Sequence, residues 1–230
     1  VIVFERLGDG RYARRAAFWQ VKQPWPDDRR KRPPVPFLTE FWADADGDGQ
    51  PLPGEVTELG RYLTATGSNG WSLNIGTDMT LYLVDHNSRS ERRSKADPNA
   101  PVLRSVPVTG ATDCGAPVYD VADMTAAPPA WYAGRVRSAN PSHDGTTVLV
   151  NQSVAKDAYE WQCFDAESGR LLWSYPNPYY QVHGSHRSGG PKPGLFRGGF
   201  NPVGTAKLPG PVGNLWVINT NCGEWHVLCE

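Results

Sequence analysis

The sequence has neither an excess of charge nor a long apolar run. Its 23 lysines and arginines nearly balance 24 aspartates and glutamates, which leaves a formal net charge of -1 at pH 7. Chains that bind nucleic acid or an anionic membrane electrostatically have basic surfaces, so no nucleic-acid partner is predicted. No apolar stretch approaches the roughly 20 residues that span a bilayer, so no membrane span is predicted. Val1 is not a natural start, so we expect a processed or cut amino terminus.

The sequence also lacks the short motifs of several classes of site. Its cysteines form no CxxC pair and no haem-attachment signature, and their spacing is not that of a zinc site. Because their number is even, one or two disulfides could form in an exported protein, and buried free thiols are the alternative. No GxSxG elbow supports a serine nucleophile. The four cysteines are Cys114, Cys163, Cys222 and Cys229.

Two histidines have a spacing that metal sites use. His183 and His186 form an HxxH pair in a glycine-rich stretch. A third ligand could come only from His143, His226 or an acid that the fold brings near. We expect loop histidines that bond to the backbone or line a funnel, with metal binding as the alternative.

Helical periodicity is missing as well. The 24 glycines and 21 prolines are spread along the chain and mark turns between short segments. Short runs with the composition of strands predict an all-β sandwich, barrel or propeller. The predicted strands are Val1–Glu5, Tyr12–Val21, Phe37–Ala43, Trp71–Ile75, Thr80–Val84, Val102–Val108, Pro117–Val121, Thr146–Asn151, Tyr159–Phe164, Arg170–Tyr175, Leu195–Phe200, Gly204–Leu208, Asn214–Asn219 and Glu224–Cys229.

One turn motif discriminates among these architectures. The stretch CFDAESGRLLW, which begins at Cys163, resembles the AxDxxTGxxxW repeat of quinoprotein (PQQ-type) β-propellers. Ser168 replaces the threonine of the repeat, and with Asp165 it would close a tight turn through side-chain hydrogen bonds. Gly169 would adopt positive φ, and Trp173 would dock into a neighbouring blade. The alternative is an ordinary hairpin with a buried tryptophan.

A second resemblance covers more of the chain. Between Phe41 and Leu228, the style and order of the segments resemble those of large secreted bacterial proteins with PQQ-like propeller repeats. It implies one β-propeller region over residues 1–230, with about three to four blades and a calcium-loop insertion at 44–55. A closed propeller needs more strands, so we expect a fragment or one cleaved chain of a larger propeller. The expected blades are an incomplete one from the first strands, Trp71–Val121, Thr146–Tyr175, and the start of another in Leu195–Glu230.

The acidic stretch DADGDGQPLPGE, Asp44–Glu55, matches the spacing of an EF-hand calcium loop. Calcium prefers about six to eight oxygen ligands, and acids at alternate positions supply them from one loop. Gly49 permits the sharp turn, and water would fill the place of Leu52. The predicted ligands are the carboxylates of Asp44, Asp46 and Asp48, the backbone carbonyl of Gln50 and both carboxylate oxygens of Glu55. The alternative is a solvated Asp/Gly turn.

The flanks of this loop differ from those of a paired EF-hand. The chain enters as the extended stretch PPVPFLTEFW, Pro51 stands where a β-branched residue would pair with a partner loop, and the sequence holds no second loop of this kind. The site resembles a lone, dockerin-like loop of an exported protein, followed at most by a short helix from Glu55. We expect calcium to lock an inter-strand connection rather than to operate a switch.

These features predict a secreted or periplasmic, non-catalytic β-propeller module with structural Ca²⁺ that serves in binding or assembly. Its partner would be a protein, a polysaccharide or the rest of its own propeller. The alternative is part of a quinoprotein-like oxidoreductase or a polysaccharide-active enzyme. A loop that surrounds its calcium offers no open coordination to a cofactor, which disfavours this alternative. No catalytic residue is predicted.

Overall fold

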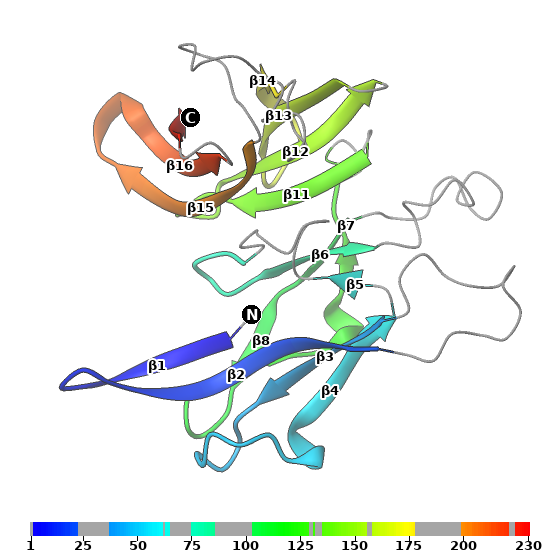
Figure 1. Cartoon of the computed structure of the whole chain (residues 1–230), viewed down its shortest axis with the longest axis vertical. Coiled ribbons are helices and arrows are strands. Elements are labelled where there is room, and N and C mark those ends of the chain that lie inside the picture. The colour runs from blue at the N-terminus through cyan, green and yellow to red at the C-terminus, as the bar shows by residue number, and fades with distance from the viewer. Residues whose placement is uncertain are drawn as a thin grey trace, which may run out of the picture.

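The computed structural model describes residues 2–22, 37–61, 63–64, 75–85, 103–128, 131, 135–155, 158–177, 199–220 and 224–230. Within these ranges the chain consists of strands and short 3₁₀ turns, without an α-helix, so the all-β prediction is confirmed. No helix of this part is long and apolar enough to cross a membrane. The strands form separate antiparallel sheets, and the described residues do not close into a barrel or ring (Figure 1).

The first sheet is a four-stranded antiparallel meander. Its opening hairpin turns at Gly8, Asp9 and Gly10, all of which have positive φ. Glycine tolerates this conformation, which explains the GDG sequence of the turn. The strands, in sheet order, are β1 (Ile2–Gly8), β2 (Arg11–Lys22), β3 (Phe37–Ala43) and β4 (Val56–Arg61). The 3₁₀ turn η2 (Pro53–Glu55) precedes β4.

The second sheet is interrupted by a two-stranded ribbon. Its order is β10-β7-β6-β5, and the ribbon of β8 and β9 lies in the sequence between β7 and β10. The four strands are β5 (Leu63–Thr64), β6 (Leu81–Asp85), β7 (Leu103–Val106) and β10 (Thr125–Ala126). The ribbon consists of β8 (Val108–Ala111) and β9 (Pro117–Tyr119), and the turn η4 (Val121–Asp123) follows it.

The third and fourth sheets are also antiparallel meanders. The third has four strands: β11 (Arg135–Pro141), β12 (Thr147–Ala155), β13 (Ala158–Asp165) and β14 (Leu171–Pro176). The fourth has three described strands: β15 (Gly199–Leu208), β16 (Gly213–Thr220) and β17 (Trp225–Cys229), with the turn η6 (Gly210–Val212) between the first two.

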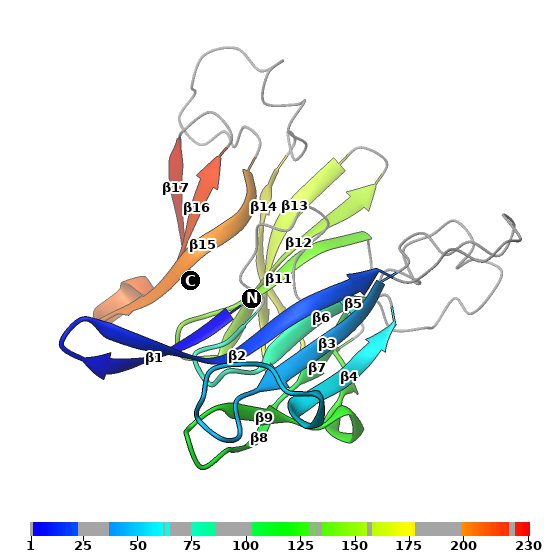
Figure 2. The same cartoon turned by 60° about the horizontal axis from the view of Figure 1, so that its bottom comes forward.

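The four sheets pack face to face in series. Figure 2 shows them fanned about the middle of the molecule, with the first sheet at the bottom and the fourth at the upper left. Alternation along a strand sends successive side chains to opposite faces. On β12, Val148 and Val150 therefore join a cluster shared with the second sheet, whereas Leu149 joins a cluster with Trp216 and Ile218 of β16. The third sheet is thus buried on both faces.

A third apolar cluster joins the first sheet to the second. Phe18 of β2 and Phe41 of β3 lie with ring centroids 4.5 Å apart, and both contact Tyr119 of the ribbon edge-on. Leu81 and Leu83 of β6 complete the same cluster and are fully buried. The ribbon therefore belongs to the core that holds the first two sheets together.

Most predicted strands are found close to their expected bounds, and Phe37–Ala43 matches β3 completely. Several strand predictions differ from the structure. The first sheet is a full meander rather than an incomplete blade, because β4 follows η2 where at most a short helix was expected. Strand β11 was not anticipated. The single strand expected over Val102–Val108 is divided, because β7 ends at Val106 in the second sheet and β8 begins the ribbon at Val108. Gly204–Leu208 is not a separate strand, because β15 runs continuously from Gly199 with register shifts near Pro202. Parts of four predicted strands, residues 1, 71–74, 102 and 195–198, lie outside the described residues.

Candidate cation site

The acidic loop connects β3 to β4 at one end of the first sheet (Figure 1). Gly47 and Gly49 have φ values of 85° and 71°. Glycine adopts such values without strain, so the alternating Asp/Gly sequence allows the tight curl of the loop. The curl brings carboxylate oxygens of Asp44, Asp46 and Asp48 within 4.8 Å of one another. The structure thus gathers three of the predicted ligands at one point.

Each of these aspartates also stabilises the curl through a backbone N–H group. Asp44 Oδ1 accepts from Gly47 N at 2.9 Å, Asp46 Oδ1 from Asp48 N at 3.1 Å, and Asp48 Oδ1 from Gln50 N at 2.6 Å. Asp46 and Asp48 are exposed, whereas Asp44 is fully buried. The two exposed carboxylates therefore keep an oxygen each that a hydrated cation can reach. Carboxylate oxygens are the ligands that a hard cation such as Ca²⁺ prefers.

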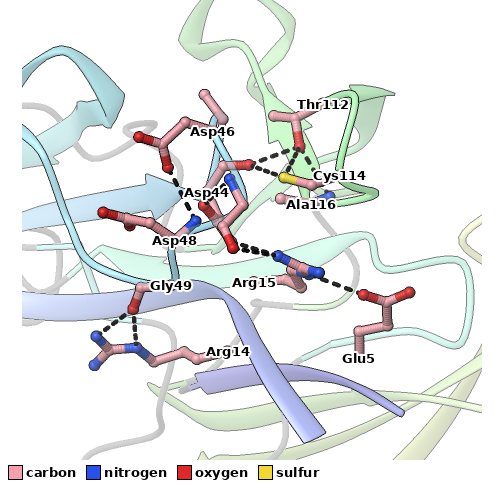
Figure 3. Close-up of polar contacts among 12 residues, drawn as sticks. Glu5, Arg14, Arg15, Asp44, Asp46, Asp48, Gly49, Thr112, Cys114 and Ala116 are labelled. Atoms are coloured by element: carbon pink, nitrogen blue, oxygen red, sulfur yellow. Dashed lines mark hydrogen bonds and ion pairs between the residues drawn. The ribbon is translucent and has the colours of Figure 1, made fainter. Parts of the chain in front are cut away.

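The buried Asp44 has a charged partner that the sequence reading did not include. Arg15 Nη1 donates to Asp44 Oδ2 at 2.7 Å, and Arg15 Nε donates to Glu5 Oε2 at 2.9 Å (Figure 3). These two carboxylates, Asp44 first, raise the pKa of Arg15. A buried carboxylate requires such compensation. Arg15 therefore neutralises part of the negative charge of the loop from the neighbouring strand β2.

The preceding arginine of β2 holds the backbone of the loop. Arg14 Nε and Nη2 both donate to the carbonyl oxygen of Gly49, at 3.1 and 2.7 Å. Its guanidinium also lies over the ring of Trp42, 5.0 Å from the centroid, in a cation–π contact. Because neighbouring residues of a strand point to opposite faces, Arg14 and Arg15 reach the loop from two sides.

The ribbon holds the start of the loop from a third direction. Thr112 Oγ1 and Cys114 Sγ both donate to the carbonyl oxygen of Asp44, at 2.7 and 2.8 Å (Figure 3). Thr112 Oγ1 also accepts from Ala116 N at 3.0 Å, which fixes the hydroxyl within the turn of the ribbon. The loop therefore connects the first sheet to the ribbon of β8 and β9.

Glu55, the predicted closing ligand, lies outside the cluster of three aspartates. Its Oε1 accepts from Ala45 N at 2.8 Å, and its Oε2 accepts from Trp42 Nε1 at 2.8 Å and Leu52 N at 3.1 Å. These donors, Trp42 first, lower the Glu55 pKa. Glu55 thus closes the base of the loop through protein donors. Gln50 is exposed, and its backbone N–H is the donor to Asp48.

The turn between β13 and β14 has the local geometry that its sequence predicts. Asp165 Oδ1 accepts from Ser168 N at 2.7 Å and Ser168 Oγ at 2.6 Å. These bonds lower the Asp165 pKa. Gly169 has φ of 70°, and a Cβ there would lie 2.8 Å from Cβ of Pro128. Trp173 packs edge-on against Trp216 of the fourth sheet, with centroids 6.4 Å apart. The turn therefore serves contacts with both neighbouring sheets.

A second aspartate turn, between β11 and β12, was missed as a site by the sequence reading. Asp144 Oδ1 accepts from Ser142, Thr146 and Asn214, and Asp144 Oδ2 pairs with Lys207 Nζ at 2.6 Å. Burial alone would raise the Asp144 pKa, but the bonds from Lys207, Thr146 and Ser142 hold it well below its usual range. Lys207 and Asn214 belong to the fourth sheet, so this turn joins the third and fourth sheets.

The other predicted site residues do not form a metal centre within the described part of the chain. Cys114, Cys163 and Cys229 are free thiols, and burial raises the pKa of Cys163 to about 12. His143 is exposed in the β11–β12 turn, whereas His226 lies on β17, 3.6 Å from Glu224. The remaining candidates, Cys222, His183 and His186, lie outside the described residues.

One cavity between the second, third and fourth sheets is too small for a cofactor. Its volume is about 40 Å³, and it has room for water rather than for an organic ligand. The lining residues are Ile75, Asn140, Pro141, Pro202, Gly204 and Thr205.

No protein-family model, curated protein or solved structure matches this chain.

Proposed function

We propose that this chain is a non-catalytic β-propeller module of a secreted or periplasmic protein, which binds one structural Ca²⁺ in its acidic loop and serves in binding or assembly. The observation that carries the calcium assignment is the convergence of Asp44, Asp46 and Asp48 within 4.8 Å. The cation would be Ca²⁺ because the donors are carboxylate oxygens, the hard ligands that this ion prefers.

The propeller assignment rests on the order and packing of the sheets. Four antiparallel sheets follow one another along the chain, and each packs face to face on the next. Propeller blades are four-stranded antiparallel sheets in radial repetition. The turn at Asp165 and the contact of Trp173 with the next sheet agree with the quinoprotein-type repeat that the sequence resembles.

Calcium would act on stability rather than on chemistry. The loop already bonds to β2 through Arg14 and Arg15 and to the ribbon through Thr112 and Cys114. A cation that binds the folded loop would strengthen this junction by mass action, by about 2.7 kcal/mol at a hundred-fold excess over its Kd. The role of the metal would therefore be to hold the first sheet and the ribbon in one arrangement.

The test is thermal unfolding of metal-free protein with added calcium and with EDTA, combined with elemental analysis of protein purified without chelator. Saturating calcium is expected to raise Tm by roughly 5–10 °C. An unchanged Tm together with less than stoichiometric calcium would defeat the metal assignment. The same sample tests the non-catalytic assignment, because a bound quinone or haem chromophore in its absorbance spectrum would overturn it.

A further inference from the structure

Asn140 of β11 is a buried amide with one unsatisfied atom. The residue is 1% exposed. Its Nδ2 donates to Ser138 Oγ at 3.1 Å and to the carbonyl oxygen of Leu149 at 3.3 Å. A rotated amide would bring Oδ1 against that carbonyl oxygen, so these bonds fix which atom is the donor. Oδ1 then accepts no hydrogen bond from the described residues. A buried acceptor in this position is costly, and ordered water is a common partner for it.

The same asparagine lines the cavity of about 40 Å³ between the second, third and fourth sheets. Pro202, Gly204 and Thr205 of β15 also line it. Strands β11 and β15 are the first strands of their sheets, and they contact each other (Figure 1). One water needs roughly 10–15 Å³ of such volume, so the cavity has room for at least one water between these two strands.

Two prolines explain why the backbone supplies no donor here. Pro141 follows Asn140 on β11, Pro202 lies on β15, and both line the cavity. Proline has no N–H group, so neither strand offers a main-chain donor at these positions. The register of β15 also shifts on both sides of Pro202. Among the described lining residues, the hydroxyl of Thr205 is the side-chain donor that remains beside the engaged amide of Asn140.

The lining at Gly204 leaves space that protein atoms do not fill. A Cβ built on Gly204 would meet no other atom within 4 Å. Gly204 does not have positive φ, so its backbone conformation does not require glycine. Protein interiors are close-packed, and a gap beside a buried polar group is a place for water. The absence of a side chain at this position therefore keeps the cavity large enough for a water molecule.

We propose that this cavity is a hydration site, in which an ordered water accepts a hydrogen bond from Thr205 Oγ1 and donates one to Asn140 Oδ1. The water would join β11 to β15 and so connect the third sheet to the fourth. It would act beside the direct bond that Trp216 Nε1 donates to the carbonyl oxygen of Asn140 at 3.2 Å. The inference concerns the packing of these two sheets and does not depend on calcium.

A crystal structure of the 230-residue chain gives the direct test. The expected result is a water oxygen about 2.5–3.2 Å from both Asn140 Oδ1 and Thr205 Oγ1. A cavity without an ordered water, or a water that contacts neither of these atoms, would overturn the proposal.

Gly204→Ala distinguishes a hydrated cavity from a dry one by the sign of its effect. The added methyl displaces the water, so Tm should fall by roughly 2–4 °C because Asn140 Oδ1 loses its donor. In a dry cavity the same methyl fills a void and Tm rises. Gly110→Ala is the matched control, since Gly110 lies exposed on β8 and its added Cβ also meets no atom within 4 Å. A Gly204→Ala protein at least as stable as this control refutes the hydration site.

Substitutions of Thr205 test the other partner of the water. Thr205→Val keeps the shape of the side chain and removes the hydroxyl, so Tm should fall by roughly 2–4 °C. Thr205→Ser keeps the hydroxyl and should retain most of the stability. Thr57→Val, at an exposed position of β4, measures the effect of the same substitution in a strand away from the cavity. Equal Tm values for the valine and serine variants, after this correction, contradict the bridge from Thr205.

Discussion

The turn at 142–146 and the loop at 44–55 are both built on aspartates, and they differ in where the compensating groups come from. In the turn, one carboxylate, that of Asp144, receives hydrogen bonds from its own turn and from Asn214, and an ion pair from Lys207. In the loop, three carboxylates converge, and the nearest cation, Arg15, is shared with Glu5. The protein thus supplies hydrogen-bond and ion-pair partners for the carboxylate of the turn. In the loop, the negative charge of the carboxylates exceeds the positive charge that the protein places beside them.

This difference separates two ways of joining sheets. A carboxylate whose oxygens are occupied by protein donors needs no bound metal ion, so the Asp144 turn should hold the third and fourth sheets together with or without calcium. Converging carboxylates repel one another unless a cation binds, so the acidic loop should respond to metal.

Asp144→Ala should lower the free energy of unfolding by about 2–4 kcal/mol, because it leaves buried donors of the third and fourth sheets without their shared acceptor. Denaturant titration measures the loss, which should be the same in calcium and in EDTA. Asp120→Ala is the control, since Asp120 caps η4 through a single bond to Ala122 N and should cost at most about 1 kcal/mol. A loss that calcium reverses would remove the distinction between the two sites.

Arg15→Gln should lower Tm by roughly 5 °C in EDTA and by clearly less in calcium. The reason is that buried Asp44 loses its cation, and a bound Ca²⁺ can replace the missing positive charge. Calorimetry in the two buffers gives the comparison. Arg11→Gln, also on β2 but exposed, should leave both values unchanged. Equal losses in the two buffers would show that Arg15 and the metal do not share Asp44.

Asp46→Asn and Asp48→Asn should each abolish most of the calcium-dependent rise in Tm while they change the Tm in EDTA by no more than about 2 °C. Both side chains are exposed, and an asparagine oxygen can still accept the local N–H bonds. Isothermal titration with calcium provides the binding constant for each variant. Asp123→Asn, an exposed control in η4, should bind as the wild type does. Unaltered calcium affinity in both variants would refute the ligand set.

Glu55→Gln should lower the Tm near neutral pH and have little effect on it at acidic pH. The Glu55 pKa is lowered from 4.5 in the folded protein, so the carboxylate contributes stability that is present above about pH 4.5. This contribution is lost as pH falls through the lowered folded-state pKa, because the protonated acid is a weaker acceptor for Trp42 and the backbone. The Tm difference between wild type and variant should therefore shrink from about pH 6 to about pH 3. A difference that is constant with pH would contradict the assigned role.

The features that the sequence predicts well are those determined locally. Glycines at positive φ mark the turns, so the hairpin at Gly8 and the turn at Gly169 lie where the sequence places them. The acidic loop also curls as its Asp/Gly alternation predicts, because its hydrogen bonds join residues two or three positions apart. Local turn chemistry of this kind needs no information from the rest of the chain.

The features that the sequence does not predict depend on distant partners. Arg15 meets Asp44 across 29 positions, and in the sequence it is only one arginine of a polar strand. Strand β11 contains Ser138 and Asn140, which look like loop residues, yet both are buried and bond to each other. Strand β4 is polar, and its pairing with β3 decides its conformation. In each case tertiary contacts outweigh the local preference.

The contact between the acidic loop and the ribbon sets an order of events during synthesis. Thr112 and Cys114 follow Asp44 by 68 and 70 positions. At translation rates of about 5–20 residues per second, the loop leaves the ribosome roughly 3–14 s before these partners exist. Arg14 and Arg15 have already been made by then. A nascent chain would therefore form its acidic loop against β2 first, and the ribbon would complete the junction only after the second sheet has begun to emerge.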